Sequence, residues 1–336
     1  MASADQIKAL ILSHVDRDEE QFYSVAMQVA AAAARKGQGK FAQELRALVD
    51  KARTGPLTQA AKSPIPIVRP REELAGLLTV SYPKTRFSDM TLNPRLLSRL
   101  QKIVTEQRHF DRLQAHGLNP RRKLLFTGPP GSGKTMTASA LAGELNLPLF
   151  VVRLDGLITR YLGESIAKLR LIFDAIENTR AVYLFDEFDS IGTHRGFAND
   201  VGEIKRVLNS FLMFIEQDNS TSLIIAATNH PQCLDYALFR RFDELLEFEL
   251  PTREQIVETL ENKLASCECV KVDFAQLADA AEGLSFAEIT QACDEAIKET
   301  IINDHNCVTT ADVLAPISDR SNFHRRFALQ NNGRSE

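Results

Sequence analysis

The sequence predicts an α/β protein in which a parallel sheet carries helices on both faces, with a smaller helical domain on either side of it. Five short apolar runs alternate with stretches that are mostly long enough for a crossover helix, which is the pattern of β-α-β units. Helical spacing of apolar residues fills the first 55 positions, and only helical patterns follow Pro251.

The apolar runs predict buried strands at residues 124–127, 149–154, 182–185, 223–227 and 245–250. Between about 55 and 82 the periodicity is lost and prolines recur, which is typical of an extended linker. We therefore expect a helical N-terminal domain at 1–55 that recognises a partner or substrate, a linker at 56–83, the sheet domain at 84–251, a helical lid domain at 252–317 and a C-terminal tail at 318–336.

Composition narrows the class of protein. The chain has 336 residues, of which 44% are hydrophobic, so a sizeable core is possible. Its net charge of −4 argues against a surface that binds nucleic acid throughout. Residues 35–53 hold six Lys and Arg against two acids, which leaves nucleic-acid remodelling as a less favoured alternative.

No targeting or membrane segment is predicted. The start of the chain lacks the apolar run of a signal peptide, and the small-apolar stretch at 30–34 is too short to span a bilayer. Cys267 and Cys269 lie close together, but no second pair supplies the other half of a zinc site. We expect a cytoplasmic protein whose cysteines are buried and reduced.

A phosphate-binding loop is predicted where Gly-Pro-Pro-Gly-Ser-Gly-Lys-Thr follows the strand that ends at Thr127 and precedes a helix over 136–145. The glycines let backbone N–H groups face phosphate oxygens, and the helix N-terminus adds a partial positive charge. Lys134 is expected to reach the β- and γ-phosphates, and Thr135 to offer its hydroxyl to Mg²⁺. The predicted nucleotide contacts are Gly128, Pro129, Pro130, Gly131, Ser132, Gly133, Lys134, Thr135 and Met136.

Polar residues at two further strand ends complete the predicted site. Asp186 and Glu187 follow the buried run 182–185, at the edge where open α/β sheets bind ligands. Asp186 is expected to hold Mg²⁺ through water, which leaves Glu187 to polarise the attacking water. Asn229 ends the next strand and can hold this water or the γ-phosphate, although an isolated Asn is more often a turn former.

These elements, in this order, resemble the AAA family of ATPases from about Arg86 to Ile317. The stretch 234–243 is similar to the arginine-finger segment of the family, and most to that of the meiotic clade with its microtubule-severing and ESCRT-disassembling members. The resemblance implies that Arg240 and Arg241 reach the ATP site of a neighbouring subunit and stabilise charge on the transferred phosphoryl group. It therefore implies ATP and Mg²⁺ as cofactors and a homo-oligomeric ring, with a hexamer as the expected form.

Residues 159–165 are similar to the first pore loop of the family, in which Tyr161 and Leu162 precede Gly-Glu-Ser. An exposed aromatic there can grip an extended peptide, although a Tyr where a loop meets a helix is more often a core residue. A second pore loop at 194–197 is a weaker match, and those residues could simply form a mobile loop.

The resemblance is incomplete around the base and the lid. Asp89 and Met90 match the family segment beside adenine, and we expect them to contact the nucleotide, but Leu92 stands where a glycine is usual. The lid motif at 283–289 has Phe286 in place of another usual glycine.

The favoured function is a motor that hydrolyses ATP and remodels or unfolds a protein substrate through the pore of the ring. The alternative is an ATP-dependent switch that recruits and regulates a partner enzyme. The short chain also resembles stand-alone bacterial AAA proteins encoded beside a subtilisin-like serine protease, in two-gene modules for phage defence and plasmid maintenance. Such a protease is therefore a further expected partner.

Overall fold

The computed structural model describes residues 29, 74, 76–157, 162–189, 200–233, 236–265, 267, 269–303 and 307–332. The chain divides into two compact units, Met1–Val68 and Arg69–Glu336. The predicted N-terminal helices therefore lie outside the described residues, apart from Val29. Within the described part of the chain, no helix combines the length and apolar character needed to cross a membrane.

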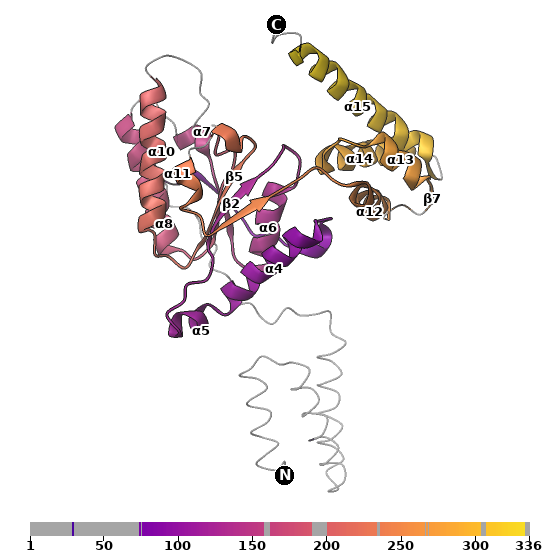
Figure 1. Ribbon diagram of the computed structural model, residues 1–336. Coiled ribbons are helices and arrows are strands. Elements are labelled where there is room, and N and C mark those ends of the chain that lie inside the picture. The colour runs from indigo at the N-terminus through magenta and orange to yellow at the C-terminus, as the bar shows by residue number, and fades with distance from the viewer. Residues whose placement is uncertain are drawn as a thin grey trace. The chain divides into compact units, whose positions relative to one another are not determined.

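A six-stranded sheet forms the centre of the second unit (Figure 1). Its strands, in spatial order, are β1 (Leu78–Ser81), β3 (Leu149–Val152), β4 (Val182–Phe185), β5 (Leu223–Thr228), β2 (Lys123–Thr127) and β6 (Glu244–Glu247). All neighbours pair in parallel except β1, which runs antiparallel to β3. The pairing of Thr127 with Thr228 and of Phe185 with Ala226 brings the carboxyl ends of the central strands to one edge.

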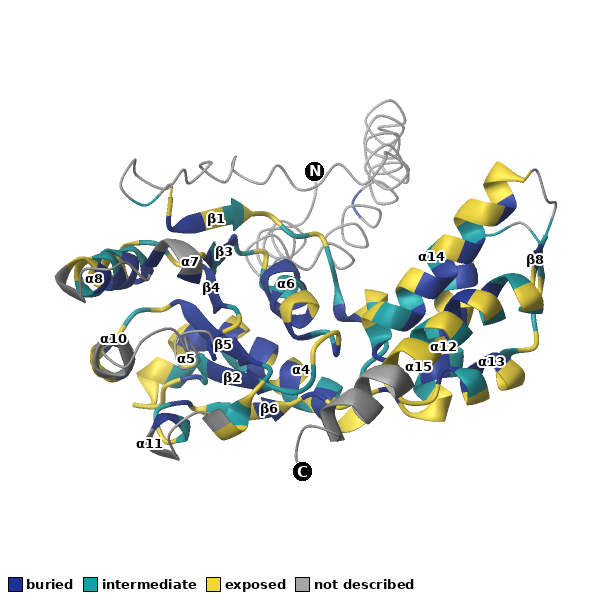
Figure 2. Cartoon of the chain, turned by 90° about the horizontal axis from the view of Figure 1, so that it is seen from above, coloured by how far each residue is buried: buried dark blue, intermediate teal, exposed yellow. Residues whose placement is uncertain are grey.

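Helices cover both faces of this sheet, as the sequence predicts (Figure 2). The helices α4 (Pro94–Arg108) and α6 (Lys134–Leu145) lie on one face, and α8 (Leu162–Asn178) and α10 (Asp200–Gln217) lie on the other. Every residue of β4 and β5 is buried, because these central strands are covered on both sides. The shorter elements of this part are η1 (Phe87–Asp89), α5 (Phe110–Ala115), α7 (Leu154–Leu157), η2 (Pro231–Cys233) and α11 (Tyr236–Phe239).

A helical subdomain follows β6 and has its own apolar core, as predicted. It contains α12 (Arg253–Leu264), α13 (Phe274–Ala280), α14 (Phe286–Ile302) and α15 (Thr310–Asn332). Three of these helices begin at a residue whose side chain accepts a backbone N–H of the first turn, namely Thr252, Asp273 and Ser285. The helix α15 continues well beyond residue 317, the predicted end of the lid domain, into the predicted tail at 318–336.

Two predictions about strands need correction. The edge strand β1 lies within residues 56–83, which the loss of periodicity indicated to be a linker. Strands also do not stop after Pro251, because β7 (Val270–Lys271) and β8 (Val308–Thr309) pair in parallel within the helical subdomain. Each of these pieces is too short to show a period of its own.

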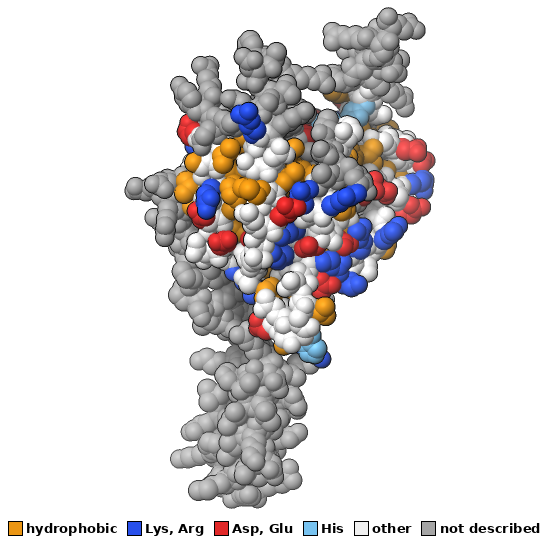
Figure 3. All heavy atoms as spheres, turned by 60° about the vertical axis from the view of Figure 1, so that its left-hand side comes forward, with side chains coloured by type: hydrophobic (Ala, Val, Ile, Leu, Met, Phe, Trp, Pro, Cys, Tyr) orange, Lys and Arg blue, Asp and Glu red, His pale blue; other side chains and the backbone are white. Residues whose placement is uncertain are grey.

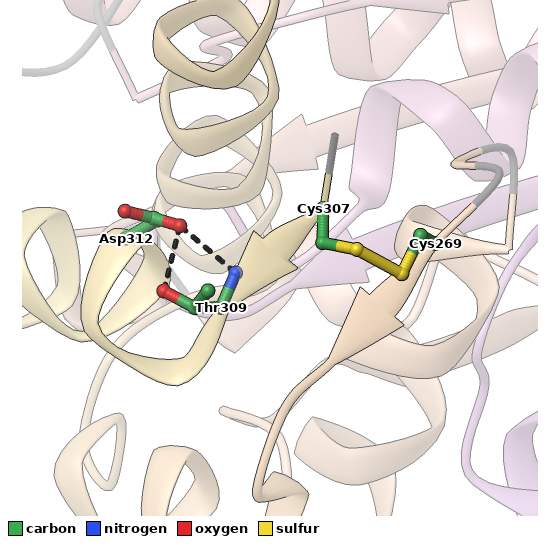
Figure 4. The surroundings of a disulfide bond; sticks show 4 residues. All are labelled: Cys269, Cys307, Thr309 and Asp312. Atoms are coloured by element: carbon green, nitrogen blue, oxygen red, sulfur yellow. Dashed lines mark hydrogen bonds between the residues drawn. A yellow bond between two sulfur atoms is a disulfide. The ribbon is translucent and has the colours of Figure 1, made fainter. Parts of the chain in front are cut away.

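The prediction of reduced cysteines is wrong for one pair. Cys269 and Cys307 form a disulfide that joins the chain just before β7 to the chain just before β8 (Figure 4). Beside it, the backbone N–H and the hydroxyl of Thr309 donate to Asp312 at 2.8 and 2.7 Å, which fixes the start of α15. Spacing along the sequence did not indicate this bond because its two halves are 38 residues apart.

Candidate nucleotide site

The predicted phosphate loop connects β2 to α6 at the carboxyl edge of the sheet. Gly128, Gly131 and Gly133 have φ angles of 150°, 74° and 98°, which disfavour residues with a Cβ atom. A Cβ atom on Gly128 would lie 2.1 Å from the carbonyl oxygen of Phe248, at the end of β6. The loop therefore has the backbone conformations and close packing that the glycine pattern predicts.

Lys134 is buried at the first position of α6, and its ammonium group lies over the loop. Its Nζ donates to the carbonyl oxygens of Gly128 and Pro129, both at 2.8 Å. Burial lowers the pKa of Lys134, and the charges of Asp186 and Asp189 partly offset that effect. The cation is thus held where a phosphate group on the loop would meet it.

The two residues predicted to hold Mg²⁺ contact each other. The Thr135 hydroxyl donates to Asp186 Oδ2 at 2.7 Å, while Asp186 Oδ1 accepts the backbone N–H of Glu187 at 3.0 Å. Glu187 is exposed and has a φ of 49°, in the left-handed region that non-glycine residues seldom occupy. Its carboxylate therefore projects from a strained turn at the edge of the sheet.

Asn229 lies on the adjacent turn, after β5, and its backbone N–H donates to Asp189 Oδ1 at 3.1 Å. The same oxygen accepts the hydroxyl of Thr228 at 2.9 Å. Sequence reasoning did not single out Asp189. The available signal was a further Asp three residues after Asp186, but its partners at the end of β5 become visible only when the strands are paired.

The segment before α4 reaches the phosphate loop from the other side. Asp89 accepts the backbone N–H of Arg86 at 2.8 Å and so closes η1. The Met90 methyl group lies 3.6 Å from where a Cβ atom of Gly133 would stand. Of the two predicted base contacts, Met90 is therefore brought to the loop, whereas the hydrogen bonds of Asp89 fix its own turn.

A cavity of about 210 Å³ adjoins the loop. Its lining comes from α4 and the segment between η1 and α4, from the phosphate loop, from the end of β6 and from the lid subdomain. It includes Leu92, Ser132, Phe248 and Phe286. The two residues that depart from the family pattern, Leu92 and Phe286, both face this space. Asp89 and Met90 are not part of the lining.

The lid subdomain touches the phosphate loop at the start of α14. The backbone N–H of Ala287 donates to the Gly131 carbonyl at 3.2 Å, and a Cβ atom on Gly131 would lie 2.5 Å from the Ser285 hydroxyl. Ser285 and Glu288 form a reciprocal cap there, with Ser285 Oγ donating to Glu288 at 2.7 Å. The phosphate loop and the lid subdomain are thus in direct contact at the predicted nucleotide site.

The predicted arginine fingers follow α11, between β5 and β6. Arg240 is exposed. Arg241 forms an ion pair with Glu216 of α10, with 2.8 Å between its Nε and the carboxylate. A single chain does not test their action in a neighbouring subunit, which stays a prediction. Tyr161 and residues 194–197 lie outside the described residues, and Leu162 begins α8.

The parallel sheet, the glycine loop at a helix N-terminus and the acids on the neighbouring strand end define a P-loop nucleoside-triphosphate-binding protein. A model of the ATPase family associated with various cellular activities (AAA) matches residues 124–250. The uncharacterized AAA family ATPase y4kL of Sinorhizobium fredii is 37% identical over 323 residues, which cover 96% of each chain. The chain therefore belongs to the AAA family, and it is an ATPase.

Two further relatives are larger proteins. Nuclear valosin-containing protein-like from Mus musculus is 36% identical over 222 residues, which are 63% of this chain and 26% of that protein. The ATP-dependent zinc metalloprotease FtsH 3 of Sphaerobacter thermophilus is 32% identical over 248 residues, which are 71% of this chain and 50% of that protein. The chain thus spans half or less of the length of these two relatives.

Proposed function

We propose that this ATPase is a motor that assembles into a ring and uses ATP hydrolysis to remodel or unfold a protein. The observation that carries the proposal is the contact of Thr135 with Asp186, next to Glu187 in the chain, at a phosphate loop that also touches the lid through Gly131 and Ala287. A change at the nucleotide can therefore be passed directly to a second subdomain, as coupling of hydrolysis to movement requires.

Each residue of the site has a distinct role in this proposal. Lys134 and the loop N–H groups bind the phosphates, and Glu187 orients and polarises the attacking water. Asn229 holds that water or the γ-phosphate from the adjacent turn. The hydroxyl of Thr135 and the carboxylate of Asp186 are hard oxygen ligands side by side, so they suit Mg²⁺, which would neutralise charge on the phosphate oxygens.

The cavity of about 210 Å³ is the proposed site of the nucleotide base. It lies between the loop residue Ser132 and the lid residue Phe286, and its mixed lining suits a flat, partly polar ring. In this chain Phe286 brings an aromatic face where the family usually has a glycine, and aromatic faces stack on bases.

A protein substrate is favoured over nucleic acid. On the face of the second unit that Figure 3 shows, hydrophobic side chains gather in one area, and Lys and Arg side chains are interspersed with Asp and Glu. A continuous basic stripe is the usual electrostatic footprint of nucleic-acid binding. Tyr161 and Leu162 are the proposed grip on the substrate, and Arg240 and Arg241 the proposed contribution to the neighbouring site in a hexamer.

The test of the water-activating role is Glu187→Gln, which keeps the shape of the side chain and removes its charge. ATP affinity, measured by calorimetry, is expected to stay close to that of the wild type while steady-state phosphate release is lost. Retained hydrolysis would remove Glu187 from this role. A Tyr161→Ala protein that hydrolyses ATP and still processes its target normally would count against threading through a pore.

The second candidate is an ATP-dependent switch that regulates a partner enzyme such as a subtilisin-like protease. One observation favours it: a relative named as an ATP-dependent protease matches this chain over only 50% of its own length. Among the described residues, no group of three or more His, Cys, Asp or Glu could hold a metal ion. Pull-down of the product of the neighbouring gene, with and without ATP, distinguishes the two candidates.

A further inference from the structure

Asp189 is a buried carboxylate, 8% exposed, on the turn that follows β4. One of its oxygens, Oδ1, accepts two hydrogen bonds from the turn after β5: the Thr228 hydroxyl at 2.9 Å and the Asn229 N–H at 3.1 Å. Thr228 Oγ1 in turn accepts the N–H of His230 at 3.0 Å. A single carboxylate therefore orders three consecutive residues on the neighbouring strand end.

A backbone bond next to Asp189 strengthens the same junction. The Phe188 N–H donates to the carbonyl of Ala227 at 2.8 Å. Glu187 precedes Phe188 and has the left-handed φ of 49°, a conformation that persists only when the surrounding contacts hold it. On the other side of Glu187, the carboxylate of Asp186 accepts a hydrogen bond from the Thr135 hydroxyl at 2.7 Å. Glu187 thus stands between two anchored neighbours.

We propose that Asp189 is a positioning residue for ATP hydrolysis, which fastens the turn carrying Glu187 to the turn carrying Asn229 through its bonds to Thr228 and Asn229. The proposal rests on the roles proposed above for Glu187 and Asn229. It makes the water-activating carboxylate and the side chain that senses the γ-phosphate one rigid unit, so that their separation is set before ATP arrives.

A competing explanation is electrostatic. The charge of Asp189 acts on Lys134, whose pKa it raises against the effect of burial. If this charge were the function, loss of Asp189 would weaken phosphate binding and raise the Kd for ATP. If the hydrogen bonds are the function, the loss falls on kcat, because misplacement of a reacting group costs turnover rather than binding.

The experiment compares Asp189→Ala, Asp189→Asn and Thr228→Val in the full chain, with Thr300→Val as the matched control. Thr300 is also buried and donates its hydroxyl within a helix, to the Ala296 carbonyl at 2.8 Å, but it belongs to the lid subdomain. We measure kcat for phosphate release, the Kd for ATP by calorimetry and the melting temperature of each variant. Rates are normalised to the fraction of protein that binds ATP.

Asp189→Ala is expected to lower kcat by about 10²-fold with the Kd for ATP changed by less than about threefold. Thr228→Val should lower kcat by about tenfold, and Asp189→Asn, which keeps an oxygen acceptor, should recover about tenfold over Ala. Thr300→Val should keep the wild-type kcat. If Asp189→Ala fails to fold, Thr228→Val and Asp189→Asn still decide the matter.

Three results would overturn the proposal: normalised kcat unchanged in Asp189→Ala or Thr228→Val, a loss confined to ATP affinity, or an Asn variant no better than Ala. The outcome for the function itself is read separately. Retained hydrolysis by Glu187→Gln contradicts the role of Glu187, whereas an inactive Glu187→Gln beside a fully active Asp189→Ala contradicts the positioning role alone.

Discussion

At the scale of single residues, the nucleotide site depends on backbone conformations that cost free energy. The left-handed turn at Glu187 costs on the order of 1–3 kcal/mol, and three glycines of the phosphate loop have positive φ angles. Neighbouring strands pack closely on both places: the chain at Phe248 leaves no room for a side chain at Gly128, and the Ala227 carbonyl accepts the N–H of Phe188, the residue after Glu187. Substitutions at the loop should therefore affect stability as well as nucleotide binding.

Gly128→Ala is the sharpest case. The new methyl group would meet the Phe248 carbonyl oxygen at 2.1 Å, and the alanine backbone would have to keep the unfavourable φ of 150°. We therefore expect a loss of about 2–4 kcal/mol in the free energy of unfolding. Gly76→Ala is the control, because a Cβ atom there meets nothing within 4 Å. Urea unfolding of the two variants measures the difference, and equal stabilities would contradict the packing described for the loop.

Most site residues could be predicted because their positions are set locally. The glycine loop, Lys134 and the acids after β4 are each read from a few consecutive residues beside one strand. Asp189 could not be found in this way, since its main partner is 39 residues away on β5. The lid contact between Gly131 and Ala287 also escapes prediction, because it depends on how two subdomains pack.

At the scale of elements, the buried strands were predictable and the marginal ones were not. The strands β4 and β5 are buried throughout and almost entirely apolar, because both of their faces are covered. By contrast, β1 has only Leu78 buried, and it exists because β3 offers an edge for antiparallel pairing. The two-residue strands β7 and β8 exist only through their pairing with each other, next to the disulfide that joins the residues just before them.

The disulfide gives a prediction for the helical subdomain. A crosslink between residues 38 positions apart is worth about 2–4 kcal/mol, mainly because it restricts the unfolded chain. Dithiothreitol should therefore lower the melting temperature of the wild type toward that of a Cys269→Ser/Cys307→Ser variant. That variant should not respond to the reductant. Calorimetric scans in both conditions test this, and a wild type indifferent to reductant would contradict it.

An ion-pair network joins α4 to the strands at the far end of the sheet domain. The Arg121 guanidinium donates hydrogen bonds to the carboxylates of Glu106 at 2.6 Å and of Glu244 at 3.0 Å. Arg99 donates to the same Glu244 carboxylate at 2.7 Å. The bond from Arg121 lowers the pKa of Glu106. Burial raises the pKa of Glu244, but the bonds from Arg121 and Arg99 outweigh it and lower that pKa overall.

The lowered pKa values of Glu106 and Glu244 predict part of the loss of folding stability in acid. A carboxyl whose pKa falls on folding stabilises the native state above its unfolded value of about 4.3, and loses that contribution as the pH falls through the folded value. Arg121→Gln should therefore be less stable than the wild type at pH 7, with a smaller further loss between about pH 5 and 3. Arg253→Gln, which breaks the exposed pair with Asp279, is the control and should change little.

At the scale of the whole molecule, the site formed by one chain brings together the phosphate loop, the acids and Asn229. The two arginines have a different setting, since Arg241 is paired with Glu216 on α10 and Arg240 is exposed. In the proposed ring these arginines complete the site of the next subunit, so a hydrolysis site needs residues from two chains. Mixing two inactive variants tests this directly.

Glu187→Gln lacks the carboxylate that we propose to activate water but keeps its arginines, whereas Arg240→Ala keeps the carboxylate and lacks an arginine. Each should be nearly inactive alone. In a ring assembled from equal amounts, about a quarter of the interfaces pair an intact Glu187 with an intact Arg240, so ATPase activity should reappear on mixing. If Arg240 acted within its own chain, no single chain would hold both an intact Glu187 and an intact Arg240, and mixing would restore nothing. Phosphate release over a series of mixing ratios should peak at intermediate ratios, and activity that never exceeds that of the better single variant would contradict action between subunits.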